Sequence, residues 1–199
     1  MKLIIASQNK GKIREFNQLL SAFGMEISSL LDHPELPDVE ETGTTFEANA
    51  RLKAETIAQL TGHLVLSDDS GLVVPTLNGE PGVYSARYAG EPKDDKANIA
   101  KLLQRLEGKN DDEREAYFVS CLVIAHPTKE SLVVEGRAYG HILTQESGQE
   151  GFGYDPIFYA PSEGATFAEI PLERKNQISH RANALKQLLE RLPNWLEEL

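Results

Sequence analysis

Apolar and polar positions along the chain follow two different spacings, and each spacing predicts a different kind of element. Aliphatic runs at residues 3–6 and 64–66 predict short buried strands, the first of them spanning residues 2–6, because a strand covered on both faces has no polar side. After residue 12, apolar side chains recur at helical spacing and predict a helix with one inner face. That face carries Ile13, Phe16, Leu20 and Phe23.

The same patterns predict the remaining elements. Residues 26–30 predict a further strand, and the alternation at residues 115–125 and 131–143 predicts two long antiparallel strands. Thr44 and Glu47 fit a capping box, with Thr44 as the N-cap of the helix that follows. Helices are predicted at residues 44–60, 94–106 and 179–192.

Composition narrows the class of protein. The 199 residues are 40% hydrophobic and 26% charged, which is typical of a globular chain with one core, or one core and a second lobe. No repeat, low-complexity tract or linker interrupts residues 1–199, so we expect a single domain. No apolar run is long enough to cross a membrane, the first residues turn polar too early for a secretory signal, and Cys121 is the single cysteine. These features predict a protein of the reducing cytoplasm.

The formal net charge of -11 disfavours a nucleic-acid polymer as partner, because such a surface repels a phosphate backbone. It does not disfavour a small anionic substrate that is bound together with a metal ion in a local cationic pocket.

Two adjacent carboxylates, Asp68 and Asp69, follow the strand at residues 64–66. We expect the strand to stop at Asp68, and an open α/β sheet binds its ligands at such strand ends. Neighbouring carboxylates repel each other unless positive charge lies beside them, and a divalent cation commonly supplies it. The alternative is that Asp-Asp-Ser-Gly is a turn that only reverses the chain.

The loop at residues 7–12 connects the first predicted strand to the first predicted helix. A glycine-containing loop in this position can bind phosphate through its backbone N–H groups and the helix dipole. It is not a Walker A loop, because Ala6 stands where the first glycine of that pattern would fall and Ile13 where a Ser or Thr belongs. An ordinary strand-to-helix turn is the alternative.

Lys53 interrupts an apolar helix face, with Asn49 beside it. A lysine in such a face either extends its ammonium group to solvent or reaches an anion in a cleft. Because this helix leads directly into the strand before Asp68, we favour the anion. At about 100° per residue, the apolar face comprises Phe46, Ala50, Ile57 and Leu60.

Two segments near the end of the chain carry further candidate chemistry. Phe152 lies between two glycines, which leaves its ring uncovered and suited to stacking on a planar ligand, and Asp155 is held extended by the proline after it. A glycine-rich turn with packed aromatics is the alternative. His180 and Arg181 lie in the first turn of the last predicted helix, where positive charge opposes the helix dipole, and Lys175 is just upstream. These basic residues indicate either a site for an electron-rich ligand or a solvated cluster.

Six segments follow one another in a definite order: SQNKGK at 7–12, ETGTTFEANA at 41–50, SDDSGL at 67–72, PGVYSAR at 81–87, GFGYDP at 151–156 and ISHR at 178–181. In this order they resemble one family closely, the inosine/xanthosine triphosphate pyrophosphatases, which remove deaminated purine nucleotides from the nucleotide pool. The resemblance covers nearly the whole chain. One departure is Ser7-Gln8, where many members have Thr-Gly; serine keeps the hydroxyl but the backbone loses some freedom.

The resemblance implies a two-lobed α/β fold around a long mixed β-sheet with helices on both sides, an active-site groove between the lobes, and a homodimer. It implies hydrolysis of ITP, dITP and XTP to the monophosphate and pyrophosphate with Mg²⁺. Asp69 is implied as the general base and a metal ligand, with Glu41 or its neighbour Glu40 as the other metal carboxylate. Triphosphate contacts are implied for Ser7, Gln8, Asn9, Lys10, Gly11, Lys12, Lys53 and Ser70, and base contacts for Phe152, Gly153, Tyr154, Asp155, Lys175, His180 and Arg181.

The residue types agree with this chemistry. A triphosphate brings about four negative charges, which Mg²⁺, Lys12 and Lys53 would neutralise, while a carboxylate beside the metal would deprotonate the attacking water. Two other functions stay open on the sequence. One is an aspartyl-phosphate phosphatase with Asp68 or Asp69 as nucleophile, although its expected Asp-x-Asp pattern is absent. The other is a nucleotide-binding module without catalysis.

Overall fold

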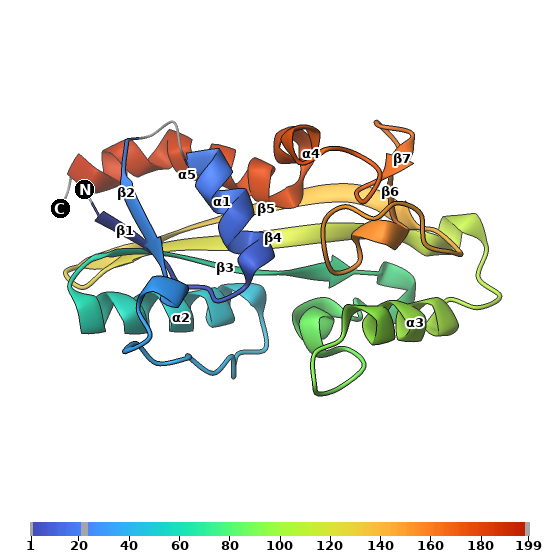
Figure 1. The fold of residues 1–199 in the computed structure, drawn as a ribbon, viewed down its shortest axis with the longest axis horizontal. Coiled ribbons are helices and arrows are strands. Elements are labelled where there is room, and N and C mark those ends of the chain that lie inside the picture. The colour runs from blue at the N-terminus through green and yellow to red at the C-terminus, as the bar shows by residue number, and fades with distance from the viewer. Residues whose placement is uncertain (1, 21–23, 198–199) are drawn as a thin grey trace. The chain divides into compact units, whose positions relative to one another are not determined.

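The structure is a computed structural model that describes residues 2–20 and 24–197. Its strands form a seven-stranded sheet in the order β2-β1-β3-β4-β5-β6-β7 (Figure 1). β1 is parallel to β2 and β3, whereas β6 is antiparallel to both β5 and β7, so the sheet is mixed and the predicted α/β class is confirmed. The strands are β1 Lys2–Ile5, β2 Glu26–Ser29, β3 Leu64–Val73, β4 Glu115–His126, β5 Lys129–Ile142, β6 Phe158–Ala160 and β7 Ala165–Thr166.

Three helices, α1 (Lys10–Leu20), α2 (Phe46–Thr61) and α3 (Asp95–Arg105), begin where a polar side chain accepts hydrogen bonds from the free backbone N–H groups of the first turn. Thr45 accepts a hydrogen bond from the N–H of Ala48 and caps α2, so the prediction of Thr44 as the cap is wrong by one residue. Within the described residues, no helix is both long and apolar enough for a bilayer crossing. The α-helices of this part of the chain are α1 Lys10–Leu20, α2 Phe46–Thr61, α3 Asp95–Arg105, α4 Leu172–Ile178 and α5 His180–Glu197.

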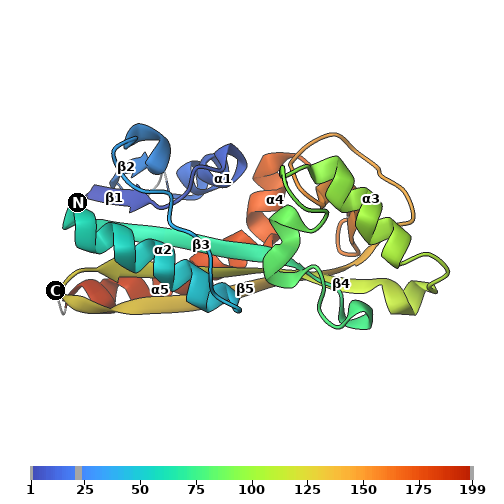
Figure 2. The same ribbon diagram turned by 90° about the horizontal axis from the view of Figure 1, so that it is seen from below.

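The chain forms two compact units. The first contains the described residues up to Asp69, Ser120–Gly136 and those from Arg181 onward. Its part of the sheet is covered on both faces, with α2 on one and with α1 and α5 on the other (Figures 1 and 2). Alternate strand residues divide between the faces as a period of two requires: Leu64 and Leu66 pack in the cluster with α1 and α5, and Val65 packs with α2. This alternation decides where the polar residues of β3 point.

The second unit contains Ser70–Val119 and Arg137–His180. Aromatic rings dominate its core: Phe118 lies 5.9 Å from Phe167 in a stacked arrangement, and Phe158 packs against both rings. Apolar residues of α3 complete this core, among them Ile99 and Leu102.

Further sequence predictions need correction or fall outside the described residues. Asp155, predicted to be extended, instead begins the 3-10 helix Asp155–Ile157. β3 does not stop at Asp68 but continues to Val73, and neither the strand end nor the chain-reversing turn predicted there exists. Leu60, assigned to the apolar face of α2, is 59% exposed, because the buried face runs instead through Ala54 and Ala58. Phe23, assigned to the inner face of the first helix, lies outside the described residues.

Candidate active site

Asp68 and Asp69 lie on opposite faces of β3, because successive side chains of a strand point in opposite directions. Asp68 follows Leu66, which packs on the side of α1 and α5. Asp69 follows Ser67, whose hydroxyl donates to the carbonyl of Ala50 in α2. Both residues are buried: Asp68 is 2% exposed and Asp69 is 4% exposed. They therefore meet two different sets of partners instead of sharing one cation.

Asp68 is enclosed by cationic and hydroxyl groups. Lys12 Nζ and Arg181 Nε lie 3.0 and 3.2 Å from Asp68 Oδ2, and the Ser120 hydroxyl donates to Oδ1 at 2.6 Å. Burial by itself would raise the pKa of Asp68, but the charges of Lys12 and Arg181 hold that pKa well below its usual range. Asp68 is thus an anion whose charge is compensated by this chain's own side chains.

A second buried carboxylate, Glu15 in α1, contacts the same arginine. Arg181 Nη1 donates to Glu15 Oε2 at 2.7 Å, and both residues are buried. Burial would lower the pKa of the Arg181 guanidinium, whereas Asp68 and Glu15 raise it above its ordinary value. Two edges of the guanidinium are therefore engaged by carboxylates, while the contact of Arg181 with a purine base stays a prediction.

Asp69 meets residues of α2 and of the loop before it. Asn49 Nδ2 donates to Asp69 Oδ2 at 3.1 Å. Lys53 Nζ lies 3.9 Å from Asp69 Oδ1, 2.6 Å from Glu41 Oε1 and 2.9 Å from the carbonyl oxygen of Asp68. The ammonium group of Lys53 thus reaches anionic and carbonyl oxygens, and it does not extend to solvent.

The environment of Asp69 favours the protonated form of its carboxyl group over the ionised form more strongly than water does. Burial raises its pKa to about 6, although the charges of Lys53 and Lys12 act against this rise. A carboxylate with such a pKa is a stronger base than an ordinary aspartate and is still largely ionised at pH 7. It can therefore accept a proton from a water molecule.

Glu41 and Asp69 fit a magnesium ion. Both carboxylates approach the ammonium of Lys53, and hard oxygen donors are what Mg²⁺ prefers. Glu40 is exposed to solvent, so Glu41 is the better placed of the two glutamates. Among the described residues there is no group of three or more His, Cys, Asp or Glu side chains that could hold a metal. Two carboxylates still suit Mg²⁺, which commonly completes its shell with water and substrate phosphate oxygens.

The loop at residues 7–12 supplies hydrogen-bond acceptors to the backbone N–H groups at the start of α1. The side chain of Asn9 accepts hydrogen bonds from the N–H groups of Gly11 and Lys12 at 2.9 and 3.1 Å. The hydroxyl of Ser7 accepts from the N–H of Asn9 at 3.1 Å. Asn9 therefore caps the helix, and an anion that used these N–H groups would have to replace its side-chain oxygen. Gln8 and Lys10 are exposed.

A second cluster lies in the other compact unit. Lys175 Nζ donates to Asp155 Oδ2 at 2.6 Å and lies 5.0 Å from the centroid of the Phe152 ring. Asp155 Oδ2 also accepts from the N–H of Phe152 at 3.0 Å. Gly151 has a φ of 77°, which favours glycine, and a Cβ there would lie 2.1 Å from Asp155 Oδ2. Both the backbone conformation and the close contact therefore require glycine at this position. These contacts bring together three of the predicted base-binding residues.

The loop that carries Phe152 is fixed by hydrogen bonds to two other segments of the same unit. The hydroxyl of Tyr154 donates to the carbonyl of Ser85 at 2.7 Å, and the N–H of Gly153 donates to Asp95 Oδ2 at 2.8 Å. His180 is buried, with its ring stacked 4.8 Å from Phe118. Ser70 is half-buried in β3.

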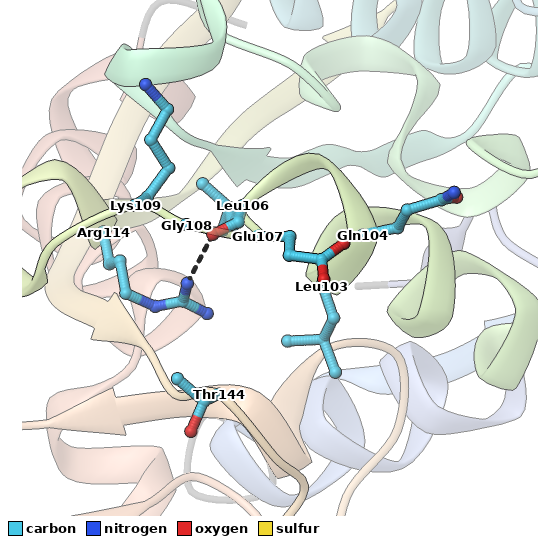
Figure 3. A pocket seen from close by; sticks show the side chains of 8 residues that line it. All are labelled: Leu103, Gln104, Leu106, Glu107, Gly108, Lys109, Arg114 and Thr144. Atoms are coloured by element: carbon cyan, nitrogen blue, oxygen red, sulfur yellow. Dashed lines mark hydrogen bonds between the residues drawn. The ribbon is translucent and has the colours of Figure 1, made fainter.

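A cavity of about 400 Å³ in the second unit contains none of the predicted site residues. Its Arg114 donates to the carbonyls of Ile142, Leu106 and Leu143, and the bond to Leu106 is drawn in Figure 3. The guanidinium is thus used to hold the backbone. The cavity is lined by Leu103, Gln104, Leu106, Glu107, Gly108, Lys109, Arg114 and Thr144 (Figure 3).

Comparison with known proteins places the chain in a family. A model of the Ham1 family matches residues 3–191. The chain belongs to the Ham1 family. It is 51% identical over 198 residues to a dITP/XTP pyrophosphatase of Listeria innocua, covering 100% of this chain and 98% of that protein. A dITP/XTP pyrophosphatase of Oceanobacillus iheyensis is 51% identical over 199 residues, covering 100% and 99%.

Solved Ham1 structures have the same fold. The Staphylococcus aureus Ham1 protein superposes with a TM-score of 0.87 at 45% identity, covering 98% of this chain and 99% of that one. A HAM1 protein from Coxiella burnetii gives a TM-score of 0.88 at 40% identity, again covering 98% and 99%. The resemblance inferred from the six segments is therefore confirmed, and the Ham1 match spans both residue clusters.

Glu15 and Ser120 are residues of the candidate site that sequence reasoning missed. Glu15 is a charged residue between Ile13 and Phe16 on the inner side of α1, and Ser120 is a hydroxyl within an otherwise apolar strand. A polar residue at a buried position was thus the signal for both, as it was for Lys53.

Proposed function

We propose that this Ham1-family protein hydrolyses deaminated purine nucleoside triphosphates, namely ITP, dITP and XTP, to the monophosphate and pyrophosphate, and so removes them from the nucleotide pool. Relatives that match over the full chain are named dITP/XTP pyrophosphatases. The structural observation that carries the proposal is that the carboxylates of Glu41 and Asp69 both approach the ammonium group of Lys53. The pKa of Asp69 there is raised to about 6.

In the proposed reaction, Asp69 takes a proton from water, and the water oxygen bonds to the α-phosphorus. The bond from that phosphorus to the oxygen bridging to the β-phosphorus breaks, and pyrophosphate leaves with the bonding electrons. The positive charges of Lys12 and Lys53 favour the negative charge that builds on the leaving group. No serine or cysteine nucleophile is needed, in agreement with a buried Cys121 whose pKa burial raises to about 12.

Mg²⁺ is the proposed cofactor, with Glu41 and Asp69 as the residues that would hold it. When bound, it would neutralise phosphate charge and lower the barrier to attack. Lys53 Nζ lies 2.6 Å from Glu41 Oε1 and 3.9 Å from Asp69 Oδ1, so its charge would also be available to the triphosphate. Ser7, Asn9 and the N–H groups at the start of α1 would contact the same phosphates.

The second cluster is proposed as the base site. Phe152 offers a ring face for stacking, and stacking is tolerant of base identity because every base has a π-face. Lys175 offers only donors, so it suits the 6-oxygen of hypoxanthine and xanthine. His180 and Arg181 stay candidates for the same role.

We also propose a homodimer that acts in the cytoplasm on a small-molecule nucleotide, with neither a nucleic-acid polymer nor a membrane as partner. The net charge of -11 supports this choice of partner.

The decisive experiment incubates the protein and Mg²⁺ with a panel of nucleoside triphosphates and measures pyrophosphate and orthophosphate separately. Pyrophosphate release in step with ITP loss is expected. Orthophosphate with a trapped phospho-enzyme would favour an aspartyl-phosphate phosphatase instead. Equilibrium binding of ITP without product over hours would favour a binding module.

A further inference from the structure

Asn49 is the residue of α2 whose polar side chain is completely buried, with 0% of the residue exposed. Asparagine is a weak helix former, and Asn49 is the fourth residue of α2. Burying its amide costs free energy unless both ends of the amide are hydrogen-bonded. Both ends of Asn49 are bonded, and neither bond is made within α2. Its presence there calls for an explanation in terms of what it contacts.

The two hydrogen bonds connect separate parts of the candidate metal site. Asn49 Nδ2 donates to Asp69 Oδ2 at 3.1 Å, and Asn49 Oδ1 accepts from the N–H of Gly43 at 2.7 Å. Gly43 lies two residues after Glu41 in the loop before α2. One amide therefore links the strand that carries Asp69 to the loop that carries Glu41.

The fit of this loop against Asn49 is tight. A Cβ on Gly43 would lie 2.7 Å from Asn49 Oδ1 and 2.8 Å from the Cβ of Ala48, closer than real Cβ atoms approach. Only glycine lets the backbone come this near. The loop is thus held at a fixed distance from the strand, and the Asp69 carboxylate is held in one rotation, with Oδ1 on the side of Lys53.

We infer that Asn49 is a positioning residue that sets Glu41 and Asp69 at the separation a divalent cation needs. The inference rests on the proposed metal site. Only a side chain with a donor and an acceptor on one terminal carbon satisfies both neighbours. Aspartate would place a second negative charge beside Asp69, and an apolar residue would remove the partner of buried Asp69 Oδ2 and of the part-buried N–H of Gly43. Removing a group that orients a metal-binding carboxylate typically lowers metal affinity by about 10- to 100-fold.

The test measures Mn²⁺ binding to the nucleotide-free protein by the electron paramagnetic resonance signal of the unbound ion. Asn49→Ala and Asn49→Leu are compared with Asn98→Ala. Asn98 is a matched control: it is a buried asparagine of α3 that donates to the Ala86 carbonyl at 3.1 Å and accepts from the Ala89 N–H at 2.7 Å, in the other compact unit. Asn49→Leu keeps the branched shape and the number of heavy atoms of the side chain, so it separates the effect of lost hydrogen bonds from the effect of a cavity.

We expect both Asn49 variants to bind Mn²⁺ at least about 10-fold more weakly than the wild type, and Asn98→Ala to bind it unchanged. With saturating ITP, raising Mg²⁺ should restore part of the kcat of Asn49→Leu, because the lost step is metal capture. Equal Mn²⁺ affinity in Asn49→Leu and the wild type would overturn the inference while leaving the proposed function intact. If the wild type binds no Mn²⁺ and releases pyrophosphate without a metal, the proposed metal site fails, and the positioning role fails with it.

Discussion

Glu15 and Asp68 share one guanidinium: Arg181 donates from Nη1 to Glu15 at 2.7 Å and from Nε to Asp68 at 3.2 Å. The three charged groups are buried, so none of them can exchange its partner for water at little cost. The ion-pair set joins α1, β3 and the start of α5 within one compact unit.

Removal of one charge from this set should destabilise the fold. Breaking a buried pair costs about 3–5 kcal/mol, and Glu15→Gln keeps a hydrogen-bond acceptor, so we expect a loss of about 2 kcal/mol in the free energy of unfolding. Urea denaturation measures it. Glu47→Gln is the control, since Glu47 pairs with Arg51 on the exposed side of α2 and should cost less than about 0.5 kcal/mol. Equal small losses in both variants would contradict the role of the buried set.

Asp69→Asn should abolish most of the activity. The amide cannot accept the proton of water, and removing a general base costs about 100-fold or more in kcat. EDTA should likewise stop turnover of the wild type, and Mg²⁺ should restore it. Pyrophosphate release from ITP is the measurement, and an Asp69→Asn variant with wild-type kcat would remove Asp69 from the mechanism.

The raised pKa of Asp69 also predicts a pH dependence of stability. Its ordinary value is 3.8 and its value in the fold is about 6, so between these two pH values the native state binds more protons than the unfolded chain. Stability from this group therefore falls as the pH rises through that window, by up to about 3 kcal/mol at about 1.36 kcal/mol per pKa unit. Asp69→Asn lacks the group, so the variant minus wild-type difference in unfolding free energy should become more positive between pH 4 and pH 7. Urea titrations in EDTA test this, and a difference independent of pH would contradict it.

Lys53→Met should lower kcat/KM for ITP by about 100-fold or more, because it removes a positive charge that we propose to contact the phosphates. The fold should survive, since methionine suits the apolar neighbours in α2. Circular dichroism and thermal unfolding provide the control for folding. A wild-type value of kcat/KM in a folded Lys53→Met variant would mean that Lys53 only compensates the negative charge of Glu41.

Much of this site could be predicted from the sequence, because its residues break local rules. Lys53 in an apolar face and the glycines around Phe152 were recognisable from spacing alone. The path of β3 could not be predicted in this way. Two adjacent aspartates look like the end of a strand, but here each is paired on its own face, and the strand continues. Glu15 was missed for a different reason. Its partner, Arg181, is 166 positions away in the chain, so no local pattern reveals the ion pair.

Base selectivity is the remaining prediction, and the structure directs attention to Lys175. An ammonium group can only donate hydrogen bonds, so it satisfies the 6-oxygen of hypoxanthine and xanthine but not the 6-amino group of adenine. Lys175 is buried, is held by Asp155 at 2.6 Å and lies beside the ring of Phe152. A site built around such a bond can reject the wrong base by up to about 10⁴-fold. Lys175→Met should therefore narrow the ratio of kcat/KM for ITP over ATP, whereas Phe152→Ala should slow the hydrolysis of both substrates alike.

Arg181→Ala should also narrow this ratio if its guanidinium reaches the base. It should leave the ratio unchanged and reduce both rates if the guanidinium serves only Asp68 and Glu15. Steady-state kinetics of the three variants with both nucleotides distinguish these roles, and an unchanged ratio in Lys175→Met would place the discrimination on another residue.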